Sequence, residues 1–282
     1  MNIFCALRSK LTRYGAAAVR KSGITRSEAD CARTALIIGG HEIELRLDNK
    51  HEIAYLDKSR SGIDDVDVAV AHQLLRPGDL VLDLGANIGY VSLHYLAQGA
   101  REVHAFEPSP EIFSRLESLR APGLHSYNLA IGDRLGQGAL ILSSSHHQGS
   151  TLYPEVVEIR PKVYGEHPAS VLVEIRTIDD LFPLLRFDYV KVDIEGGELD
   201  FVRGAVRMLK ERPPRVLSLE IKPEFRTEYL AALESYFSCV RRVDYDRNSG
   251  RIRFMEVDAA SVGPFLNSPP NYIFSNDESI FR

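Results

Sequence analysis

The stretch VLDLGANIGYVSLHYLA, residues 81–97, decides the fold of this chain. Its first residues are typical of a buried strand, a turn follows from Gly85 to Gly89, and a helical pattern begins directly after the turn. Glycine lets the backbone turn sharply and approach a ligand closely. A strand, a glycine turn and a helix in this order are typical of α/β domains that bind nucleotide-like ligands. The open question is which charged molecule this turn receives.

The same order of strands and helices continues along the chain. Outside residues 80–84, strands are predicted over residues 103–106, 124–129, 189–194, 215–221, 240–244 and 272–274. Helices are predicted over residues 63–75, 88–97, 109–119, 199–209 and 229–237. Strands that are apolar throughout are typical of a parallel sheet covered by helices on both faces. The sequence therefore predicts a doubly wound, mainly parallel α/β fold, whose ligands bind beyond the carboxyl ends of the strands.

The N-terminal residues are predicted to extend this fold. Residues 1–62 form the extension and residues 63–282 the main domain, with a β-hairpin at 34–47 around Gly39 and Gly40. Residues 1–27 contain six basic and no acidic side chains, and their apolar residues fall near one helical face. This pattern fits a membrane-surface helix, a targeting segment, or a docked helix with a solvated basic side.

Composition excludes several classes of protein. The chain has 282 residues and a net charge of −5, so its charge does not indicate a nucleic-acid partner. No apolar run reaches the roughly 18 residues of a membrane span. The three cysteines lie far apart without a CxxC or Cys/His cluster, which argues against a zinc site or disulfides and suits a reducing compartment. We expect a cytoplasmic protein, with peripheral membrane contact through residues 1–27 as the alternative.

The glycine turn does not match phosphate-binding patterns. Its spacing differs from GxGxxG, and no GK[ST] follows, which excludes a P-loop. Asp83, expected at the mouth of the cleft, would repel a pyrophosphate and attract an ammonium group. Glu107 lies 22 residues after Gly85, near the roughly 20-residue interval at which an acid meets ribose hydroxyls. With Asn128 and Asp133 as polar candidates beside an adenine ring, the expected ligand is S-adenosylmethionine.

Five segments resemble the FkbM-type methyltransferases in the expected order over about residues 64–222. They are VLDLGANIGYVSL (81–93), AFEPSP (105–110), NLAIGD (128–133), TIDDL (177–181) and FDYVKVDIEGGELDFVRGA (187–205). The resemblance implies a seven-stranded Rossmann-like methyltransferase sheet, S-adenosylmethionine as cofactor, and methylation of hydroxyl oxygens. It also implies contacts to the cofactor: the methionine part from Asp83, Gly85, Asn87 and Gly89, the ribose from Glu107, and the adenine from Asn128.

The segment KVDIEGGE, residues 191–198, contains the strongest candidates for catalysis. Alternation along a strand places Lys191, Asp193 and Glu195 on one face. Charges inside a sheet are costly unless they are paired, so these residues form either an ion-pair network or a catalytic group. As a catalytic group, Asp193 orients the acceptor or takes its proton, with Glu195 and Glu220 as further candidates. The acids could instead hold a divalent cation, although no metal site is predicted.

The long stretch from 143 to 170 contains His146 and His147. A loop of this length is functional or mobile, and His147 is a candidate general base, although loop histidines are more often only solvated. His94 is expected at the surface. The predicted acceptor is a hydroxyl on a sugar, glycan or glycosylated metabolite. A non-catalytic cofactor-binding scaffold is the alternative. A nicotinamide-dependent oxidoreductase fits less well, because the chain has neither GxGxxG nor Tyr-x-x-x-Lys.

Overall fold

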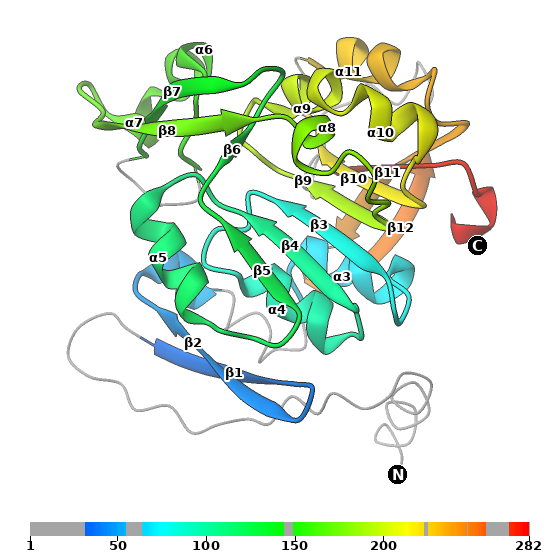
Figure 1. The fold of residues 1–282 in the computed structure, drawn as a ribbon, viewed down its shortest axis with the longest axis horizontal. Helices are drawn as coiled ribbons and strands as arrows, with labels where there is room; N and C mark the ends of the chain where they lie inside the picture. The colour runs from blue at the N-terminus through cyan, green and yellow to red at the C-terminus, as the bar shows by residue number, and fades with distance from the viewer. Residues whose placement is uncertain are drawn as a thin grey trace.

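A computed structural model describes residues 32–54, 64–143, 149–222, 225–246, 248–257 and 271–281. Its centre is an eight-stranded sheet in the order β12-β11-β13-β10-β9-β3-β4-β5 (Figure 1). The strands are β3 (Leu80–Leu84), β4 (Glu102–Phe106), β5 (Leu124–Tyr127), β9 (Tyr189–Val192), β10 (Val216–Glu220), β11 (Cys239–Asp246), β12 (Arg251–Glu256) and β13 (Asn271–Ser275). The run from β10 to β5 is parallel, and β13 pairs antiparallel with both β10 and β11.

Helices cover both faces of this sheet, which confirms the doubly wound fold. One face carries α3 (Val66–Leu74), α4 (Tyr90–Ala97) and α5 (Pro110–Ser118), and the other carries α8 (Ile178–Leu181), α9 (Glu198–Gly204), α10 (Val206–Glu211) and α11 (Arg226–Leu233). Successive residues of β3 enter opposite cores: Val81 packs with α3 and α4, whereas Leu82 packs with α9 and α10. Burial on both faces explains why four of the five residues of the strand are apolar.

The sheet has one strand more than the seven predicted. The additional strand, β12, pairs antiparallel with β11 at the edge of the sheet. Asp246 accepts a hydrogen bond from the backbone of Asn248 at 2.9 Å, and Gly250 has a left-handed φ of 66° before β12 begins. The strand itself is mostly exposed and alternates charged with apolar residues, so it lacks the apolar run by which the central strands were recognised.

A smaller three-stranded sheet lies beyond the carboxyl ends of the central strands. It consists of β6 (Ala130–Ile131), β8 (Ser170–Arg176) and β7 (Gly136–Ile141), in that order. The stretch predicted to be irregular contains two short helices, α6 (Pro154–Ile159) and α7 (Pro161–Tyr164), each with proline in its first turn. Thr177 caps α8, because its side chain accepts a hydrogen bond from the backbone N–H of Asp180.

The predicted hairpin is confirmed and joins the main core. Strands β1 (Ala32–Ile38) and β2 (His41–Leu47) pair around Gly39 and Gly40, and their apolar residues pack with α3 and α4. Residues 1–27, predicted to be a basic amphipathic helix, lie outside the described residues. None of the described helices is long and apolar enough to cross a membrane.

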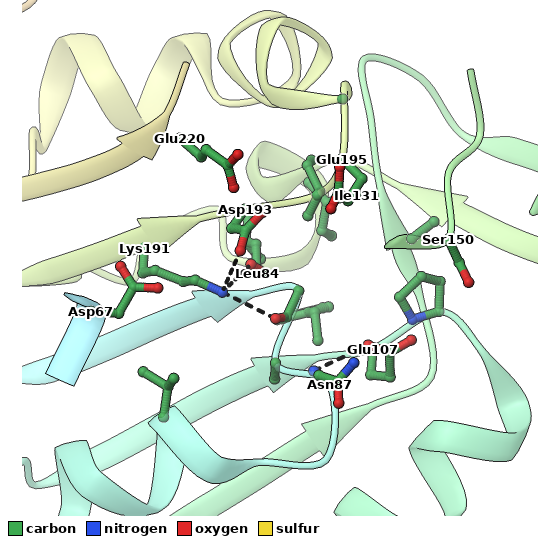
Figure 2. Close-up of a pocket in the computed structure, with 18 of the residues that line it drawn as sticks. Asp67, Leu84, Asn87, Glu107, Ile131, Ser150, Lys191, Asp193, Glu195 and Glu220 are labelled. Atoms are coloured by element: carbon green, nitrogen blue, oxygen red, sulfur yellow. Dashed lines mark hydrogen bonds and ion pairs between the residues drawn. The ribbon is translucent and has the colours of Figure 1, made fainter. Parts of the chain in front are cut away.

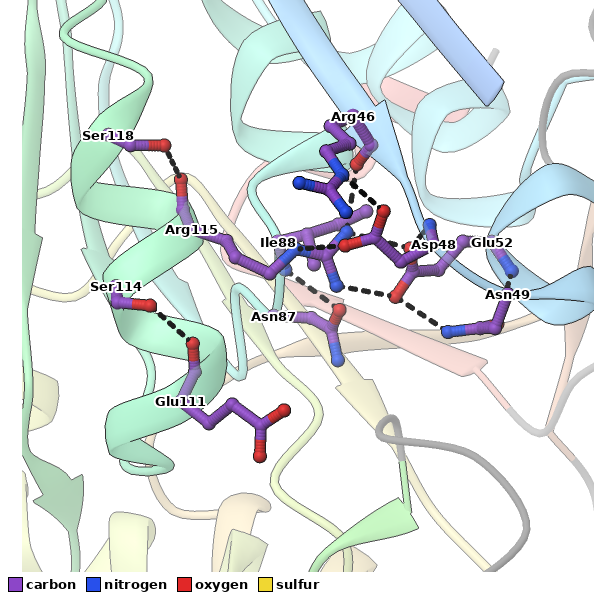
Figure 3. A network of polar contacts seen from close by, with 10 residues as sticks. All are labelled: Arg46, Asp48, Asn49, Glu52, Asn87, Ile88, Glu111, Ser114, Arg115 and Ser118. Carbon is purple, nitrogen blue, oxygen red and sulfur yellow. Dashed lines mark hydrogen bonds and ion pairs between the residues drawn. The ribbon is translucent and has the colours of Figure 1, made fainter. Parts of the chain in front are cut away.

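A buried ion pair ties the segment after the hairpin to helix α5 (Figure 3). Arg115 donates from both terminal nitrogens to Glu52, at 2.9 and 2.8 Å, and also to the carbonyl of Arg46 at 2.8 Å. Glu52 is only 1% exposed and accepts further hydrogen bonds from the backbone of Asp48 and the side chain of Asn49. A bidentate, fully hydrogen-bonded arginine–carboxylate pair fixes geometry well. It therefore holds the N-terminal extension against the helix that follows β4.

His94 is buried, so its predicted position at the surface is wrong. Helix α4 lies between the sheet and the hairpin, and the ring of His94 packs 4.7 Å from that of Tyr90. Burial lowers the pKa of His94 to about 4, which keeps the ring uncharged at neutral pH. The hairpin itself was predicted, but its packing over this side of α4 was not.

Candidate active site

A cavity of about 300 Å³ opens at the carboxyl ends of β3, β4, β9 and β10, the edge of the sheet where the chemistry was predicted (Figure 2). A volume of this size lies at the lower end of the range for small-molecule sites. The polar side chains that line it are Asp65, Asp67, Asn87, Glu107, Ser150, Tyr153, Lys191, Asp193, Glu195, Glu220 and Asn271. The lining thus contains six carboxyl groups and one ammonium group.

The glycine turn forms the floor of this cavity. Gly85 has a left-handed φ of 78°, and a Cβ atom on it would lie 1.8 Å from the carbonyl oxygen of Asp193. Only glycine allows the turn to approach the end of β9 so closely. The backbone N–H groups of Gly85 and Ala86 both donate to the carbonyl of Phe106, at 3.1 and 2.9 Å. These contacts join the turn to the two neighbouring strands.

Asp83 lies beneath the turn and not at the mouth of the cleft, so its predicted position is wrong. Its side chain is fully buried, accepts a hydrogen bond from Ser92 at 2.5 Å, and lies 3.4 Å from the ammonium of Lys191. Lys191 in turn donates to the carbonyls of Leu84 and Gly85, at 3.3 and 3.0 Å. A buried carboxylate requires a partner, and here that partner also holds the turn. Asp83 therefore supports the turn from below.

Glu107 lines the cavity at the end of β4. Its oxygens accept from the backbone N–H groups of Asn87 at 3.1 Å and Ser109 at 2.9 Å. Burial raises the pKa of Glu107 to about 7, although both hydrogen bonds oppose this shift. A carboxylate offers about four acceptor positions, so two remain for hydroxyl donors. This position fits the predicted contact with a ribose.

Three other predicted cofactor contacts do not line the cavity. Gly89 precedes α4 with a φ of 85°, and a Cβ atom there would lie 2.8 Å or less from side-chain atoms of Leu116 and Leu119 in α5. The amide of Asn128 donates to the carbonyl of Glu107 at 2.9 Å, which fixes the loop after β4. Asp133 pairs with the neighbouring Arg134 at 3.1 Å. None of the three lines the cavity, and their contacts with a cofactor stay a prediction.

Asp193 and Glu220 extend from the ends of neighbouring strands toward each other (Figure 2). The charge of Asp193 and burial together hold the pKa of Glu220 well above its usual range. Two adjacent carboxyl groups of this kind cannot both ionise readily. The pair therefore favours the state in which Glu220 keeps its proton. Lys191 is the nearest cation to Asp193, at 3.8 Å.

Glu195 has a different environment from these two acids. Its carboxylate lies 3.0 Å from the ammonium of Lys222 and 3.2 Å from the guanidinium of Arg160. Burial and the charge of Asp193 raise the pKa of Glu195, and the two cations oppose this. The hydroxyl of Thr151 donates to the carbonyl of Glu195 at 2.7 Å. Glu195 thus links the strand end to residues 149–164, and this makes it a weaker candidate for a base.

Residues 149–153 form one wall of the cavity, since Ser150, Leu152 and Tyr153 line it. The hydroxyl of Tyr153 donates to Asp200 in α9 at 2.5 Å, which holds this wall against the helix. His147, the candidate general base in the same stretch, lies outside the described residues together with His146. Its role stays a prediction.

The sequence analysis missed Asp67 and Asn271. Asp67 lies in the first turn of α3, Asn271 begins β13, and the amide of Asn271 donates to Asp67 at 3.1 Å. Burial raises the pKa of Asp67 to about 8. An acid inside the apolar run VDVAVA was a visible signal, because a charged residue on the buried face of a helix is rarely structural alone. Nothing in the sequence indicated Asn271.

The chemistry of this lining fits S-adenosylmethionine. The cofactor bears a cationic ammonium and a cationic sulfonium, and the cavity offers carboxyl groups with little competing positive charge. Its ribose hydroxyls suit Glu107. The cofactor has no phosphate, and the cavity accordingly shows no cluster of basic residues among the described residues.

Comparisons with known proteins agree with this chemistry. The family model of the methyltransferase FkbM domain matches residues 83–247, which is 165 of the 282 residues. The chain is 29% identical over 142 residues to "Methyltransferase 1" of Beauveria bassiana, covering 44% of this chain and 57% of that protein. It is 51% identical over 45 residues to the 31-O-demethyl-FK506 methyltransferase FkbM of Streptomyces tacrolimicus, covering 16% and 17% of the two chains. The chain thus spans less than two thirds of either relative.

Solved structures of methyltransferases are similar only distantly. A TehB-like methyltransferase of Corynebacterium glutamicum aligns with a TM-score of 0.40 at 8% identity, covering 80% of this chain and 96% of the other. A precorrin-6y C5,15-methyltransferase of Geobacter metallireducens aligns with a TM-score of 0.39 at 14% identity, covering 74% and 84%. The family assignment depends on neither. With the family model matching more than half of its length, the chain belongs to the FkbM family of S-adenosylmethionine-dependent methyltransferases.

Proposed function

We propose that this protein transfers a methyl group from S-adenosylmethionine to a hydroxyl oxygen of a sugar, glycan or glycosylated metabolite. The observation that supports it is the pair of carboxyl groups, Asp193 and Glu220, at the ends of adjacent strands beside the cavity. A hydroxyl acceptor must lose its proton as it is methylated, and a carboxylate is a suitable recipient. The name of the Streptomyces relative also describes methyl transfer at an oxygen of its substrate.

In this proposal the residues of the chain position and deprotonate the acceptor. The carboxylate of Asp193 accepts a hydrogen bond from the acceptor hydroxyl and takes its proton as the oxygen–carbon bond forms. Glu220, whose pKa is raised by its neighbour and by burial, favours its protonated form and so limits the negative charge there. When bound, S-adenosylmethionine supplies a methyl group that its sulfonium already activates. Alignment of the acceptor with that methyl group then accounts for much of the rate acceleration.

Three variants separate catalysis from cofactor binding. Asp193→Asn keeps the shape of the side chain but cannot accept the proton, so we expect turnover to fall about 10²- to 10⁴-fold with cofactor affinity nearly unchanged. Glu107→Gln should weaken cofactor binding and leave turnover at saturating cofactor close to wild type. Glu195→Gln, whose carboxylate is neutralised by Lys222 and Arg160, should lower turnover much less than Asp193→Asn.

Two measurements test the proposal. Calorimetric titration with S-adenosylhomocysteine and with NADH measures cofactor binding. Transfer of a radiolabelled methyl group to a panel of glycosides and hydroxylated metabolites measures turnover. Equal losses of turnover and affinity in Asp193→Asn and Glu107→Gln would contradict the division of roles. Cofactor binding without transfer to any hydroxyl acceptor would favour the scaffold alternative. Binding of NADH alone would favour the oxidoreductase. Transfer to nitrogen or carbon acceptors only would reject O-methylation.

A further inference from the structure

A second cluster of ionisable side chains lies on the sheet, away from the active site. Glu102 and His104 alternate along β4 and so lie on one face of the strand, and His125 is the residue of β5 that pairs with His104. Their ligand atoms all lie within 4.8 Å of one another, and no other group of three such residues was found in the part of the chain that the structure describes. Two strands of the rigid central sheet thus bring together two imidazoles and a carboxylate.

The distances within this cluster approach those of a coordinated ion. Glu102 Oε2 lies 3.8 Å from Nε2 of His104 and 3.8 Å from Nε2 of His125. In a tetrahedral zinc site with metal–ligand distances near 2.0–2.1 Å, neighbouring ligand atoms are roughly 3.4 Å apart. The side chains of Glu102 and His125 are 41% and 48% exposed, so both can rotate to shorten the distances between the ligand atoms to the value that a metal ion requires.

His104 supplies the observation that indicates a missing ligand. Its side chain is only 10% exposed, and its Nε2 has no hydrogen-bond partner among the described residues. Its other nitrogen, Nδ1, lies 2.9 Å from the hydroxyl of Tyr127, and Phe182 and Phe187 pack edge-on against the ring. When Nδ1 carries the ring proton and donates it to the Tyr127 hydroxyl, the lone pair of Nε2 is free to bind a metal ion, as in metal-bound histidines.

We propose that Glu102, His104 and His125 form a site for Zn²⁺ or a similar imidazole-binding divalent metal ion, with a fourth position open to water. Two imidazoles and one carboxylate suit zinc, nickel or copper and suit magnesium or calcium poorly. Glu102 begins β4, His104 is the middle residue of β4 and His125 is the second residue of β5, and none of the three lines the cavity at the carboxyl ends of the strands. The site is therefore separate from the proposed methyl transfer. The spacing of cysteines and histidines along the chain argued against a zinc site, because the residues of this cluster come together only across two strands.

The test is calorimetric titration of the full chain with ZnCl₂, NiCl₂ and MgCl₂. We expect one zinc ion per chain in the wild type, binding of nickel, and no binding of magnesium. His125→Gln removes an exposed ligand and should weaken zinc binding at least tenfold. Tyr127→Phe, which removes only the hydroxyl beside Nδ1, should weaken it about tenfold while all three ligands remain.

The control is His72→Gln, because His72 also faces a carboxylate, Asp64, at 3.3 Å, but the two belong to no cluster of three potential metal ligands among the described residues. This variant should bind zinc as the wild type does. A variant with alanine at both His146 and His147 should do the same. Thermal unfolding without metal verifies that each variant is folded. Absence of zinc binding in the wild type, or unchanged zinc affinity in both His125→Gln and Tyr127→Phe, would overturn the proposal.

Discussion

Replacing Gly85 with alanine tests whether the floor of the cavity depends on the absence of a side chain. The residue has a left-handed φ of 78°, and its added Cβ atom would lie 1.8 Å from the backbone oxygen of Asp193. The conformational strain alone costs about 1–2 kcal/mol for a residue with a Cβ atom. Since a backbone carbonyl at the end of a central strand cannot rotate away, the turn itself must move by more than an ångström.

That movement breaks hydrogen bonds that the turn makes with both neighbouring strands. Gly85 and Ala86 donate to the carbonyl of Phe106, and Lys191 donates to the carbonyl of Gly85 at 3.0 Å. Each lost bond costs about 1 kcal/mol. With the strain included, Gly85→Ala should lower the free energy of unfolding by about 3–5 kcal/mol. A domain with a typical stability of about 5–15 kcal/mol remains largely folded after such a loss.

Gly78→Ala is the matched control. Gly78 has a similar left-handed φ of 91°, but a Cβ atom there would meet nothing within 4 Å. It should cost only the conformational strain, about 1–2 kcal/mol. Urea unfolding measures the stability of both variants, and calorimetric titration with S-adenosylhomocysteine measures the affinity of the site whose floor the turn forms. Gly85→Ala should lose at least tenfold in affinity and Gly78→Ala almost nothing. Equal destabilisation by the two variants, or normal ligand affinity in Gly85→Ala, would refute the close approach.

Three further predictions concern buried charge. The pKa of His94 is about 4 in the folded protein and about 6.5 in the unfolded chain. The free energy of unfolding should therefore fall by up to about 3 kcal/mol as the pH falls from 6.5 to 4, because the unfolded chain binds the proton more readily. Urea unfolding of His94→Gln should show a smaller loss over this range. Arg115→Ala leaves the buried Glu52 carboxylate unpaired and should cost about 3–5 kcal/mol, whereas Arg33→Ala, which removes an exposed pair with Glu44, should cost less than about 1 kcal/mol. Because the pKa of Glu107 is about 7, the affinity for S-adenosylhomocysteine should rise between about pH 5.5 and pH 8 in the wild type and stay level in Glu107→Gln. An affinity that does not change with pH in either protein would show that this carboxylate does not contact the ribose.

The sequence predicted the strands that carry a local pattern of apolar residues. Strands β3, β4, β9 and β10 are mostly apolar on both faces because helices cover both faces of the sheet, and this pattern identified them and the edge where ligands bind. Strand β12 escaped notice because an edge strand with one solvated face needs few apolar residues. The helices α6 and α7 escaped notice because each is six residues or fewer and shows no helical period.

Side-chain positions were less predictable than the strands that hold them. Glu107 and Asp193 follow strand ends directly, so their place beside the cavity follows from topology. Asp83 is one residue earlier than the end of β3, and in a strand one residue changes the face on which a side chain lies. The role of Asp67 required knowledge of which turn of α3 faces the sheet edge, and that depends on packing between distant segments.

The buried charges of this site also explain why its ligand should be a cation. Lys191 is the one ammonium group in the lining of the cavity, and it lies 3.4 Å from Asp83 and 3.8 Å from Asp193, so its charge is shared between two carboxyl groups. Glu195 pairs with Lys222 and Arg160, whereas burial raises the pKa of Asp67 to about 8, and the charge of Asp193 and burial raise that of Glu220 well above its usual range. Protons on these groups provide the neutralisation that a positively charged ligand could provide instead. An anionic ligand would gain no such compensation, and this is the physical reason why an adenosyl sulfonium fits the cavity better than a dinucleotide.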